Sequence, residues 1–570
     1  MVDEAGAAHT YSYDTANPFN RLSEADPASL STQYQYDVAG NVTRITQPSG
    51  ATTEYYNFTA FNAPQRIKDA LGNWTLLKYD AKGNLTDTVK LKTGKVPTAG
   101  STPALADIAA WSKRNYDAAT GQPTQSKTLR DFGGATLGNF TGGTGPTVTT
   151  TYDASTLYPI QIARLGDKTG DGVINAADPA DSATLQFDSL GRQIIGIDSD
   201  WQTVSSSYDA DNLPITGTDA AGQPRDYFYD GDGRLTGQEL VLNQNGQSRL
   251  WDSAFRRYDS AGRLAQTLDA GGHVSQYRYD AAGNLTQITD PDNYTLGFDY
   301  DAVNRWSKAY DKAGHAVERK LDAAGRVKLV TNPNGNSTLY SYWNASQDGR
   351  LKSVTQPKVG SYTLGQVRQF DYDAPGQIVK TTDTPAAGST EAVRDTLNCY
   401  DALGRLIRVA GPAYVDQNPT SVTFNQTIRP VYNNLGHLTE IKAGQTTADG
   451  GTAINADSGV SASDTVTTQV SYVNDDFGRK LSETDANNQV TTYTYDLNNN
   501  VKTQQTPGAG GHTLTYVWDY GHQLLSVTAE DGRKIEYDRN FRDAGIRYQC
   551  WFNYGRSRGE ARWSDCGRGD

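Results

Sequence analysis

The residues with the clearest potential for chemistry lie in one short segment, residues 167–178, which reads DKTGDGVINAAD. Calcium prefers six to eight hard oxygen ligands, which a twelve-residue loop supplies from positions 1, 3, 5, 7, 9 and 12, with glycine at position 6. Gly172 stands at that sixth position. The predicted ligands are the side chains of Asp167, Thr169, Asp171, Asn175 and Asp178 and the backbone carbonyl of Val173. The sequence therefore predicts a site for one calcium ion in an insertion at residues 160–182.

This segment resembles the dockerin-type version of the EF-hand calcium loop, which ends in Asp rather than Glu. It departs from that pattern at two points. Thr169 is a weaker ligand than Asp or Asn, and Pro179 follows the loop directly, where a helix would begin. The alternative interpretation is a polar Asp-Gly loop of the kind that recurs throughout the chain.

No other set of residues predicts catalysis. Several of the six histidines lie in or beside expected turns, which explains their positions without a catalytic triad. The sequence contains no His-Glu-x-x-His and no phosphate-binding loop. Carboxylates are spread along the chain at turn positions, so no pair stands out as an acid and base. We therefore expect that the protein is not an enzyme.

Length and composition exclude several other classes of protein. The chain has 570 residues, a net charge of −13 and three cysteines, so we expect neither a nucleic-acid partner nor a disulfide scaffold. No stretch of 18 apolar residues predicts a membrane span. No charged segment followed by an apolar one comes after Met1, so no ordinary signal peptide is expected. The 10% of aromatic residues argues for a folded chain.

A repeat with a step of 21 residues determines the expected architecture. Its marker is Tyr-Asp followed shortly by Gly or Asn, with degenerate copies such as Leu321-Asp322. Successive units start at residues 258, 279, 300, 321 and 342, and another series starts at 187, 208 and 229.

One unit, residues 279–300, shows how the repeat should fold. Two turn signals, at residues 280–283 and 290–293, bound segments of about six residues rich in Thr, Tyr, Ile and Leu. That length and composition predict strands rather than helices. Tyrosines spaced two apart should share one face of the sheet and form cross-strand ladders. A stacking platform for sugar rings is the alternative role for these tyrosines.

These signals divide the chain into four parts. Residues 1–92 and 151–538 carry the repeats, and the calcium-type insertion lies within the second part. Residues 93–150 depart from the repeat, and Ala104–Ser112 predicts a short helix. Residues 539–570 hold seven arginines and no lysine, and they carry no repeat. We predict that this last part is a truncated or non-native tail; the alternative is a cap on the last strand.

The unit YDxxGNLxxxxDxxGxxxxYxYD resembles the YD repeat of Rhs proteins over roughly residues 10–538. The resemblance implies an all-β, YD-repeat β-solenoid, in which a hairpin ribbon spirals into a partial hollow cocoon. In bacterial members of that family the cocoon encloses and delivers a C-terminal toxin. Implied partners are therefore that toxin domain or the remaining part of the shell, together with secretion-system or cell-surface components. The implied location is secreted or at the bacterial cell surface. The competing interpretation is a surface adhesin or glycan-binding wall protein built on the same repeats.

Overall fold

The described part of the chain forms one continuous antiparallel β-sheet of 43 strands, in which each strand pairs with the next along the sequence. The structure is a computed structural model, and no α-helix occurs among the residues it describes. It describes residues 9–98, 101–198, 202–218, 224–244, 247–269, 271–358, 360, 365–415, 423–446, 464–496, 499–507, 511–518, 524–538, 547–551 and 564–565. The all-β prediction is confirmed.

The strands are mostly five to seven residues long, as the repeat predicts. Those up to residue 331 are β1 (Thr10–Tyr13), β2 (Arg21–Ala25), β3 (Ser31–Tyr36), β4 (Val42–Thr46), β5 (Thr52–Phe58), β6 (Pro64–Lys68), β7 (Trp74–Tyr79), β8 (Leu85–Leu91), β9 (Ile108–Tyr116), β10 (Pro123–Thr128), β11 (Thr147–Tyr152), β12 (Pro159–Leu165), β13 (Asp181–Phe187), β14 (Gln193–Ile197), β15 (Thr203–Tyr208), β16 (Pro214–Thr218), β17 (Pro224–Tyr229), β18 (Leu235–Gln244), β19 (Gln247–Tyr258), β20 (Leu264–Leu268), β21 (Val274–Tyr279), β22 (Leu285–Thr289), β23 (Thr295–Tyr300), β24 (Trp306–Tyr310), β25 (Ala316–Leu321) and β26 (Val327–Thr331).

The remaining strands include a group of longer hairpins, β32–β35. They are β27 (Ser337–Tyr342), β28 (Leu351–Thr355), β29 (Val367–Tyr372), β30 (Ile378–Thr384), β31 (Arg394–Tyr400), β32 (Leu406–Val415), β33 (Thr423–Tyr432), β34 (Leu438–Thr446), β35 (Asp464–Asn474), β36 (Lys480–Asp485), β37 (Val490–Tyr495), β38 (Val501–Gln505), β39 (Thr513–Trp518), β40 (Leu524–Ala529), β41 (Lys534–Asp538), β42 (Arg547–Trp551) and β43 (Ser564–Asp565). Two short 3-10 turns, η1 (Leu105–Asp107) and η2 (Ala345–Gln347), interrupt the series.

The turn after each Tyr-Asp pair is held by its aspartate. In the unit that starts at Tyr279, Oδ1 of Asp280 accepts the backbone N–H of Asn284 at 2.8 Å. Gly283 has φ +93°, a conformation that residues with a Cβ rarely adopt. Turns of this kind lie along one edge of the ribbon, which we call the Tyr-Asp edge. The second turn of each unit, such as residues 290–294, lies along the other edge, which we call the opposite edge.

Arginine and tyrosine side chains connect neighbouring Tyr-Asp turns. Arg263 donates from Nε to Asp259 Oδ2 at 2.8 Å and from Nη1 to the carbonyl of Asp280 at 3.1 Å. The hydroxyl of Tyr279 donates to the carbonyl of Leu264 at 2.9 Å. The same bond to the carbonyl 15 residues earlier is made by Tyr36, Tyr79, Tyr208, Tyr229, Tyr300, Tyr342 and Tyr495. These tyrosines therefore connect neighbouring strands through hydrogen bonds as well as through packing.

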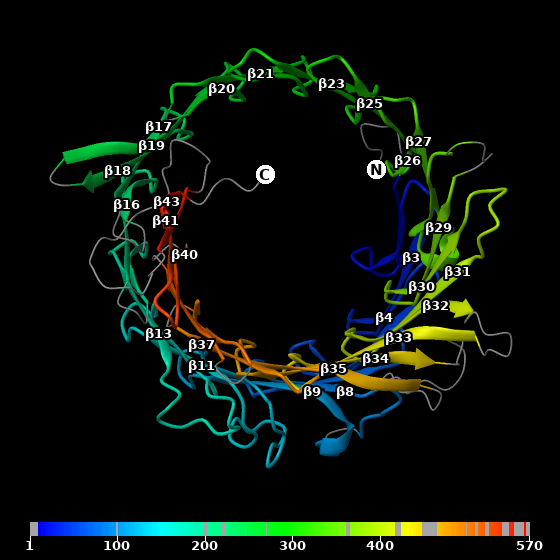
Figure 1. Cartoon of the computed structure of the whole chain (residues 1–570). Helices are drawn as coiled ribbons and strands as arrows, with labels where there is room; N and C mark the ends of the chain where they lie inside the picture. The colour runs from blue at the N-terminus through cyan, green and yellow to red at the C-terminus, as the bar shows by residue number, and fades with distance from the viewer. Residues whose placement is uncertain are drawn as a thin grey trace.

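The ribbon coils because its hairpins are irregular on one edge. At nearly every Tyr-Asp turn the strand register shifts by one residue, as between Arg278 and Tyr279. A bulge bends a strand and increases its right-handed twist, so a bulge repeated on one edge curves the whole ribbon. Figure 1 shows the result, a ring that overlaps itself around an open centre. We call β1–β26 the first winding and β27–β43 the second winding.

Successive windings meet edge to edge. Ser49, on the opposite edge of the first winding, donates its backbone N–H to Asp348 on the Tyr-Asp edge of the second winding at 2.7 Å. A similar contact joins Asn434 to Arg130, and another joins Asp476 to Asp167. The sequence separations of these three pairs are 299, 304 and 309 residues, so one winding takes about that length of chain. The predicted spiral is confirmed.

The predicted helix at Ala104–Ser112 is wrong. Only residues 105–107 form a 3-10 turn, and Ile108–Tyr116 is strand β9, paired with β8 and β10. The residues at 93–150 thus continue the sheet, and the loop at 129–146 folds over it. The reason is a buried hydrophobic cluster in which strand side chains from β7–β9 meet loop side chains. Its members are Leu76, Val89, Leu91, Ile108, Trp111, Leu129, Phe132 and Ala135.

A buried ion pair also attaches this loop to the sheet. Asp87 and Lys113 are both almost fully buried, and their charged atoms lie 2.7 Å apart. Lys113 Nζ also donates to the carbonyls of Thr136 and Asn139, while Asp87 accepts the indole N–H of Trp111 at 2.9 Å. Because each charge has several partners, burial of the pair is compensated.

The predicted tail lies largely outside the described residues. Within 539–570 the structure describes β42, which pairs with β41, and the short β43, which pairs with β42. That the tail is truncated or non-native stays a prediction.

Candidate functional site at the contact between windings

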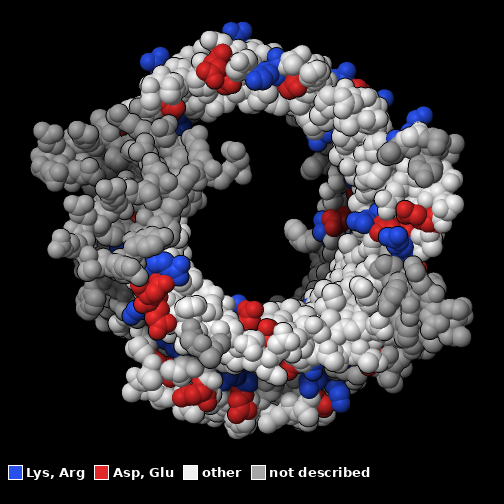
Figure 2. Space-filling view, viewed as in Figure 1, with Lys and Arg blue, Asp and Glu red and all other residues white. Residues whose placement is uncertain are grey.

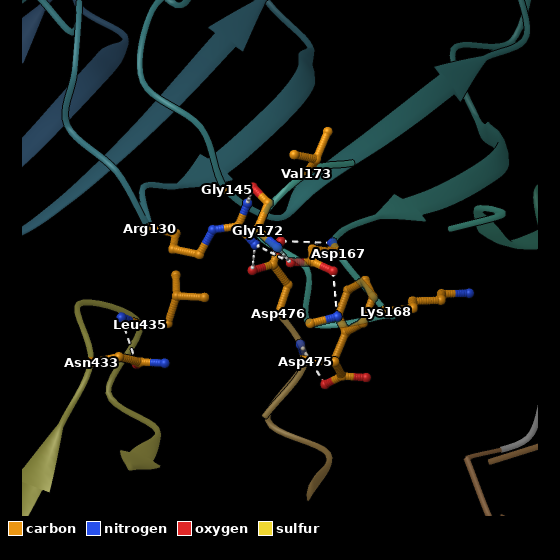
Figure 3. A network of polar contacts seen from close by, with 12 residues as sticks. Arg130, Gly145, Asp167, Lys168, Gly172, Val173, Asn433, Leu435, Asp475 and Asp476 are labelled. Atoms are coloured by element: carbon orange, nitrogen blue, oxygen red, sulfur yellow. Dashed lines mark hydrogen bonds and ion pairs between the residues drawn. The ribbon is translucent and has the colours of Figure 1, made fainter. Parts of the chain in front are cut away.

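The predicted calcium loop connects β12 to β13 on the opposite edge of the first winding, where the second winding packs against it (Figure 3). Its first and last acids are buried: Asp167 is 2% exposed and Asp178 is 1% exposed. Thr169, Asp171, Val173 and Asn175 are exposed. The six predicted ligands therefore fall into a buried pair and an exposed set.

Asp178 closes the loop on itself. Its Oδ1 accepts the backbone N–H groups of Lys168 at 2.7 Å and Thr169 at 3.0 Å, and its Oδ2 accepts that of Asn175 at 3.0 Å. Burial alone would raise the pKa of Asp178, but these donors outweigh it and lower the pKa below its ordinary value. Both carboxylate oxygens of Asp178 thus accept hydrogen bonds from the backbone of the loop.

The carboxylate of Asp167 binds both the backbone of the loop and the side chain of Arg130. Its Oδ1 accepts the backbone N–H of Gly170 at 2.6 Å, and its Oδ2 accepts that of Gly172 at 2.7 Å. Arg130 Nη1 lies 3.0 Å from Oδ2, and Arg130 Nη2 donates to the carbonyl of Gly172 at 2.7 Å. A guanidinium therefore binds the carboxylate that the calcium prediction assigns to the metal.

Three of the four exposed ligands, Asp171, Val173 and Asn175, lie close together, whereas the hydroxyl of Thr169 contacts Asp167. The amide nitrogen of Asn175 lies 3.4 Å from both Asp171 Oδ2 and the carbonyl of Val173, and Asp171 Oδ1 accepts the N–H of Val173 at 2.8 Å. Among the described residues, no three His, Cys, Asp or Glu side chains gather where one metal ion could bind them together. Gly172 does adopt the positive φ, +88°, expected at the sixth loop position. The loop thus shares this one backbone feature with a calcium loop, while its two buried carboxylates already bind backbone N–H groups of the loop and, for Asp167, Arg130. Calcium binding stays a prediction.

The loop binds the second winding through Asp476. Asp476 is 5% exposed and lies in the Tyr-Asp turn at residues 475–479, between β35 and β36. Its Oδ1 forms an ion pair with Arg130 Nη1 at 2.5 Å. Its backbone N–H donates to the carbonyl of Asp167 at 2.8 Å, and the N–H of Asp167 donates to Asp476 Oδ2 at 2.8 Å. Burial raises the pKa of Asp476 in spite of these partners.

Further contacts surround this network. Asn434, in the turn before β34, donates from its side chain to the carbonyl of Arg130 at 2.9 Å. The ring of Phe477 lies over Gly166, where an added Cβ would approach it to 2.9 Å. Leu481 lies against Gly170 in the same way. The network therefore combines charge, backbone pairing and close packing.

The sequence prediction did not include Arg130, Asn434 or Asp476. One signal was available: among the residues that directly follow a Tyr-Asp pair or its degenerate copy, Asp476 is the only acidic one. Nothing in the sequence, however, pairs that residue with an arginine more than 300 positions earlier.

Two histidines of the described residues lie beside aspartates in turns. His273 and His315 each lie 3.0 Å from an aspartate, Asp269 and Asp311, in turns where all four side chains are exposed. Across the residues that the structure describes, no helix combines the length and apolar character needed to cross a membrane.

Comparison with known families identifies the repeat. The family described as RHS Repeat matches residues 17–52, 258–295, 279–316, 322–358 and 475–511. These segments carry the Tyr-Asp turns and strands described above. No curated protein sequence matches the chain.

Solved structures show the same fold. A crystal structure of TcdB2-TccC3 aligns with a TM-score of 0.59 and 14% identity, over 95% of this chain and 31% of that one. A crystal structure of TcdB2-TccC3 without its hypervariable C-terminal region aligns with a TM-score of 0.62 and 13% identity, over 98% and 34%. A Photorhabdus luminescens Tc holotoxin pore aligns with a TM-score of 0.60 and 14% identity, over 95% and 32%. The chain thus spans about a third of the length of each of these proteins.

Proposed function

We propose, from the premise that the chain is an RHS-repeat protein with the fold of the TcdB2-TccC3 structures, that it is a shell segment that encloses a toxin domain for delivery. The observation that carries this proposal is the coiled sheet itself. The ribbon overlaps itself by edge-to-edge contacts about 300 residues apart and leaves an open centre, which Figure 2 shows in space-filling form. A complete shell built from such a sheet would exclude proteases and other proteins from whatever it surrounds.

The shell has a structural role in this proposal and no catalytic one. Acidic and basic side chains are interspersed over the face seen in Figure 2, which gives no single-sign surface for nucleic acid. The enclosed partner is a C-terminal toxin domain, and the remaining part of the shell comes from further RHS-type ribbon. Secreted or cell-surface display in a bacterium follows from delivery. A hydrolase screen of the purified chain tests the absence of catalysis, and turnover of any substrate class would contradict it.

Enclosure is tested with the polypeptide encoded directly after this chain in its gene. That domain is produced fused to the complete shell, which consists of this chain and the remaining ribbon, and separately on its own. Both proteins are exposed to a nonspecific protease. We expect the fused domain to survive long after the free domain is degraded, because the sheet surrounds it. Equal rates of degradation would reject the shell. Binding of the purified chain to cell-wall glycans, together with equal degradation, would favour the adhesin.

A further inference from the structure

The repeat creates a problem of register between the windings. Turns along the Tyr-Asp edge recur with nearly the same backbone every 21 residues, as do turns along the opposite edge. Two such edges could dock in several registers that differ by one unit, and the backbone alone would distinguish them weakly. A shell with one defined shape therefore needs side chains that are not repeated.

The contact between windings contains such side chains. At the residue after the Tyr-Asp pair, most turns carry Ala, Ser, Gly or another small or apolar residue. The turn at 475–479 carries Asp476, and the turn at 433–437 carries Asn434. Both bind one segment of the first winding: Asp476 pairs with the Arg130 guanidinium, and Asn434 binds the Arg130 carbonyl.

We propose that Arg130 and the loop at 166–178 form a keyed clasp, which recognises Asp476 and Asn434 and thereby fixes the register of the second winding on the first. The clasp is a device of the fold and does not depend on what the shell encloses. A slip of one unit would bring the turn at 496–500 to the clasp, with Leu497 in place of Asp476.

Burial gives the clasp its selectivity. Asp167 and Asp476 are 2% and 5% exposed, and Arg130 lies between their carboxylates. In a slipped register the backbone N–H of Asp167 would lose its acceptor, and Arg130 and Asp476 would lose their ion pair, because an apolar side chain can replace neither contact. Leaving a buried charge without its partner is strongly unfavourable, and single buried polar groups are known to fix register in other repeating folds.

The first experiment measures amide hydrogen exchange in calcium-free buffer with a chelator. The amides of Asp167 and Asp476 donate across the windings, so they report the clasp directly. We expect Asp476→Ala and Arg130→Ala each to reduce their protection by about tenfold, with no further loss in the double variant. Asp476→Asn should restore part of it, because the amide oxygen can still accept the N–H of Asp167, although the amide nitrogen cannot accept from Arg130. Asp211→Ala, which removes an exposed carboxylate from a first-winding turn, should change nothing.

The second experiment moves the acidic residue that Arg130 recognises by one unit, from position 476 to position 497. In wild type, an amine-reactive reagent should join Lys168 to Lys480, because Gly170 and Leu481 lie against each other. In the variant Asp476→Ala/Leu497→Asp, the cross-link should move to Lys502, which stands one unit after Leu481. An unchanged Lys168–Lys480 cross-link in that variant, or unchanged protection in Asp476→Ala and Arg130→Ala, would overturn the proposal. A soluble Asp476→Asn variant keeps the test informative if the alanine variants do not fold.

Discussion

The guanidinium of Arg263 lies over the ring of Tyr279, 4.7 Å from its centre, so the arginine of one unit covers the tyrosine of the next. The same stacking recurs along the Tyr-Asp edge in the pairs Arg192–Tyr208, Arg234–Tyr258, Arg326–Tyr342, Arg405–Tyr432 and Arg479–Tyr495. Each arginine is also held by the aspartate four residues before it, so every pair ties one turn to the following turn. Stability along the ribbon is therefore a sum of contacts between neighbours.

The hydroxyl of the Tyr-Asp tyrosine should contribute measurably to stability. Tyr279→Phe leaves the carbonyl of Leu264 without its donor, and we expect a loss of about 1 kcal/mol in the free energy of unfolding. Tyr277→Phe is the matched control on the same strand, since that hydroxyl has only a contact of 3.5 Å to Thr267. Urea unfolding followed by tyrosine fluorescence measures both. Equal losses of unfolding free energy in the two variants would show that the hydrogen bond from Tyr279 to the carbonyl of Leu264 does not stabilise the protein.

Acid should destabilise the ribbon through its turn aspartates. In these turns the residue four positions on donates hydrogen bonds to the carboxylate and lowers its pKa below the ordinary value of 3.8, as in Asp37, Asp80, Asp188, Asp230, Asp259 and Asp280. A lowered folded pKa gives stability that is complete above the unfolded pKa and is lost as the pH falls through the folded one.

Melting temperature should therefore be nearly constant from neutral pH to about pH 5 and then fall steeply below about pH 4. Thermal unfolding measured at pH values from 7 to 2.5 tests this. A melting temperature that stays level or rises on acidification would contradict the role of the turn carboxylates.

The buried pair beneath the 129–146 loop should be sensitive to loss of one partner. Lys113→Ala leaves Asp87 charged and buried, and we expect a loss of about 3–5 kcal/mol in the free energy of unfolding of this region. Lys90→Ala, an exposed lysine on β8, is the control and should cost little. Denaturant titration with amide exchange of β7–β9 measures the difference. Similar losses in both variants would mean that the pair is not needed to attach the loop.

Calcium and Arg130 should compete for the loop. We expect one calcium ion to bind through Asp167, Asp171 and Asp178, and to displace the guanidinium from Asp167. Arg130→Ala should therefore raise the affinity several-fold, whereas Asp171→Ala should abolish binding without affecting the clasp. Isothermal titration calorimetry of the three proteins decides this. Traces without a calcium signal for both wild type and Arg130→Ala would reject the site.

Deletion of one unit tests whether the clasp or the length of the winding fixes the register. Removing residues 279–299 keeps the strand register within the ribbon but shortens the interval from Arg130 to Asp476 by one unit. Removing residues 496–516 leaves that interval intact and is the control. We expect the Asp167 amide to stay protected in both deletions, measured by hydrogen exchange, because the clasp selects Asp476. Loss of protection in the first deletion alone would mean that the length of the winding fixes the register.

The sequence by itself determined the local structure of this protein. The 21-residue step, the Asp-x-x-Gly turns and the period-two tyrosines predicted strands and turns, because each depends on residues within one or two units. The coiled ribbon was implied by the resemblance of the repeat to that of Rhs proteins. The helix predicted at Ala104–Ser112 failed because Ile108 and Trp111 enter a buried cluster that includes side chains from the loop at 129–146. Tertiary packing there overrides local propensity.

The clasp was decided only by the tertiary structure. The acids of the loop could be read as metal ligands, since their spacing fits calcium and their other partners lie far away in the sequence. Whether Arg130 meets Asp476 depends on the curvature added by every bulge over a whole winding of about 300 residues. A small change in that curvature per unit would bring a neighbouring turn within reach of the loop, and the clasp then selects the turn that carries Asp476. No local sequence pattern encodes the total curvature of a winding. The partner of Arg130 can therefore be identified only in the tertiary structure, where the second winding lies on the first.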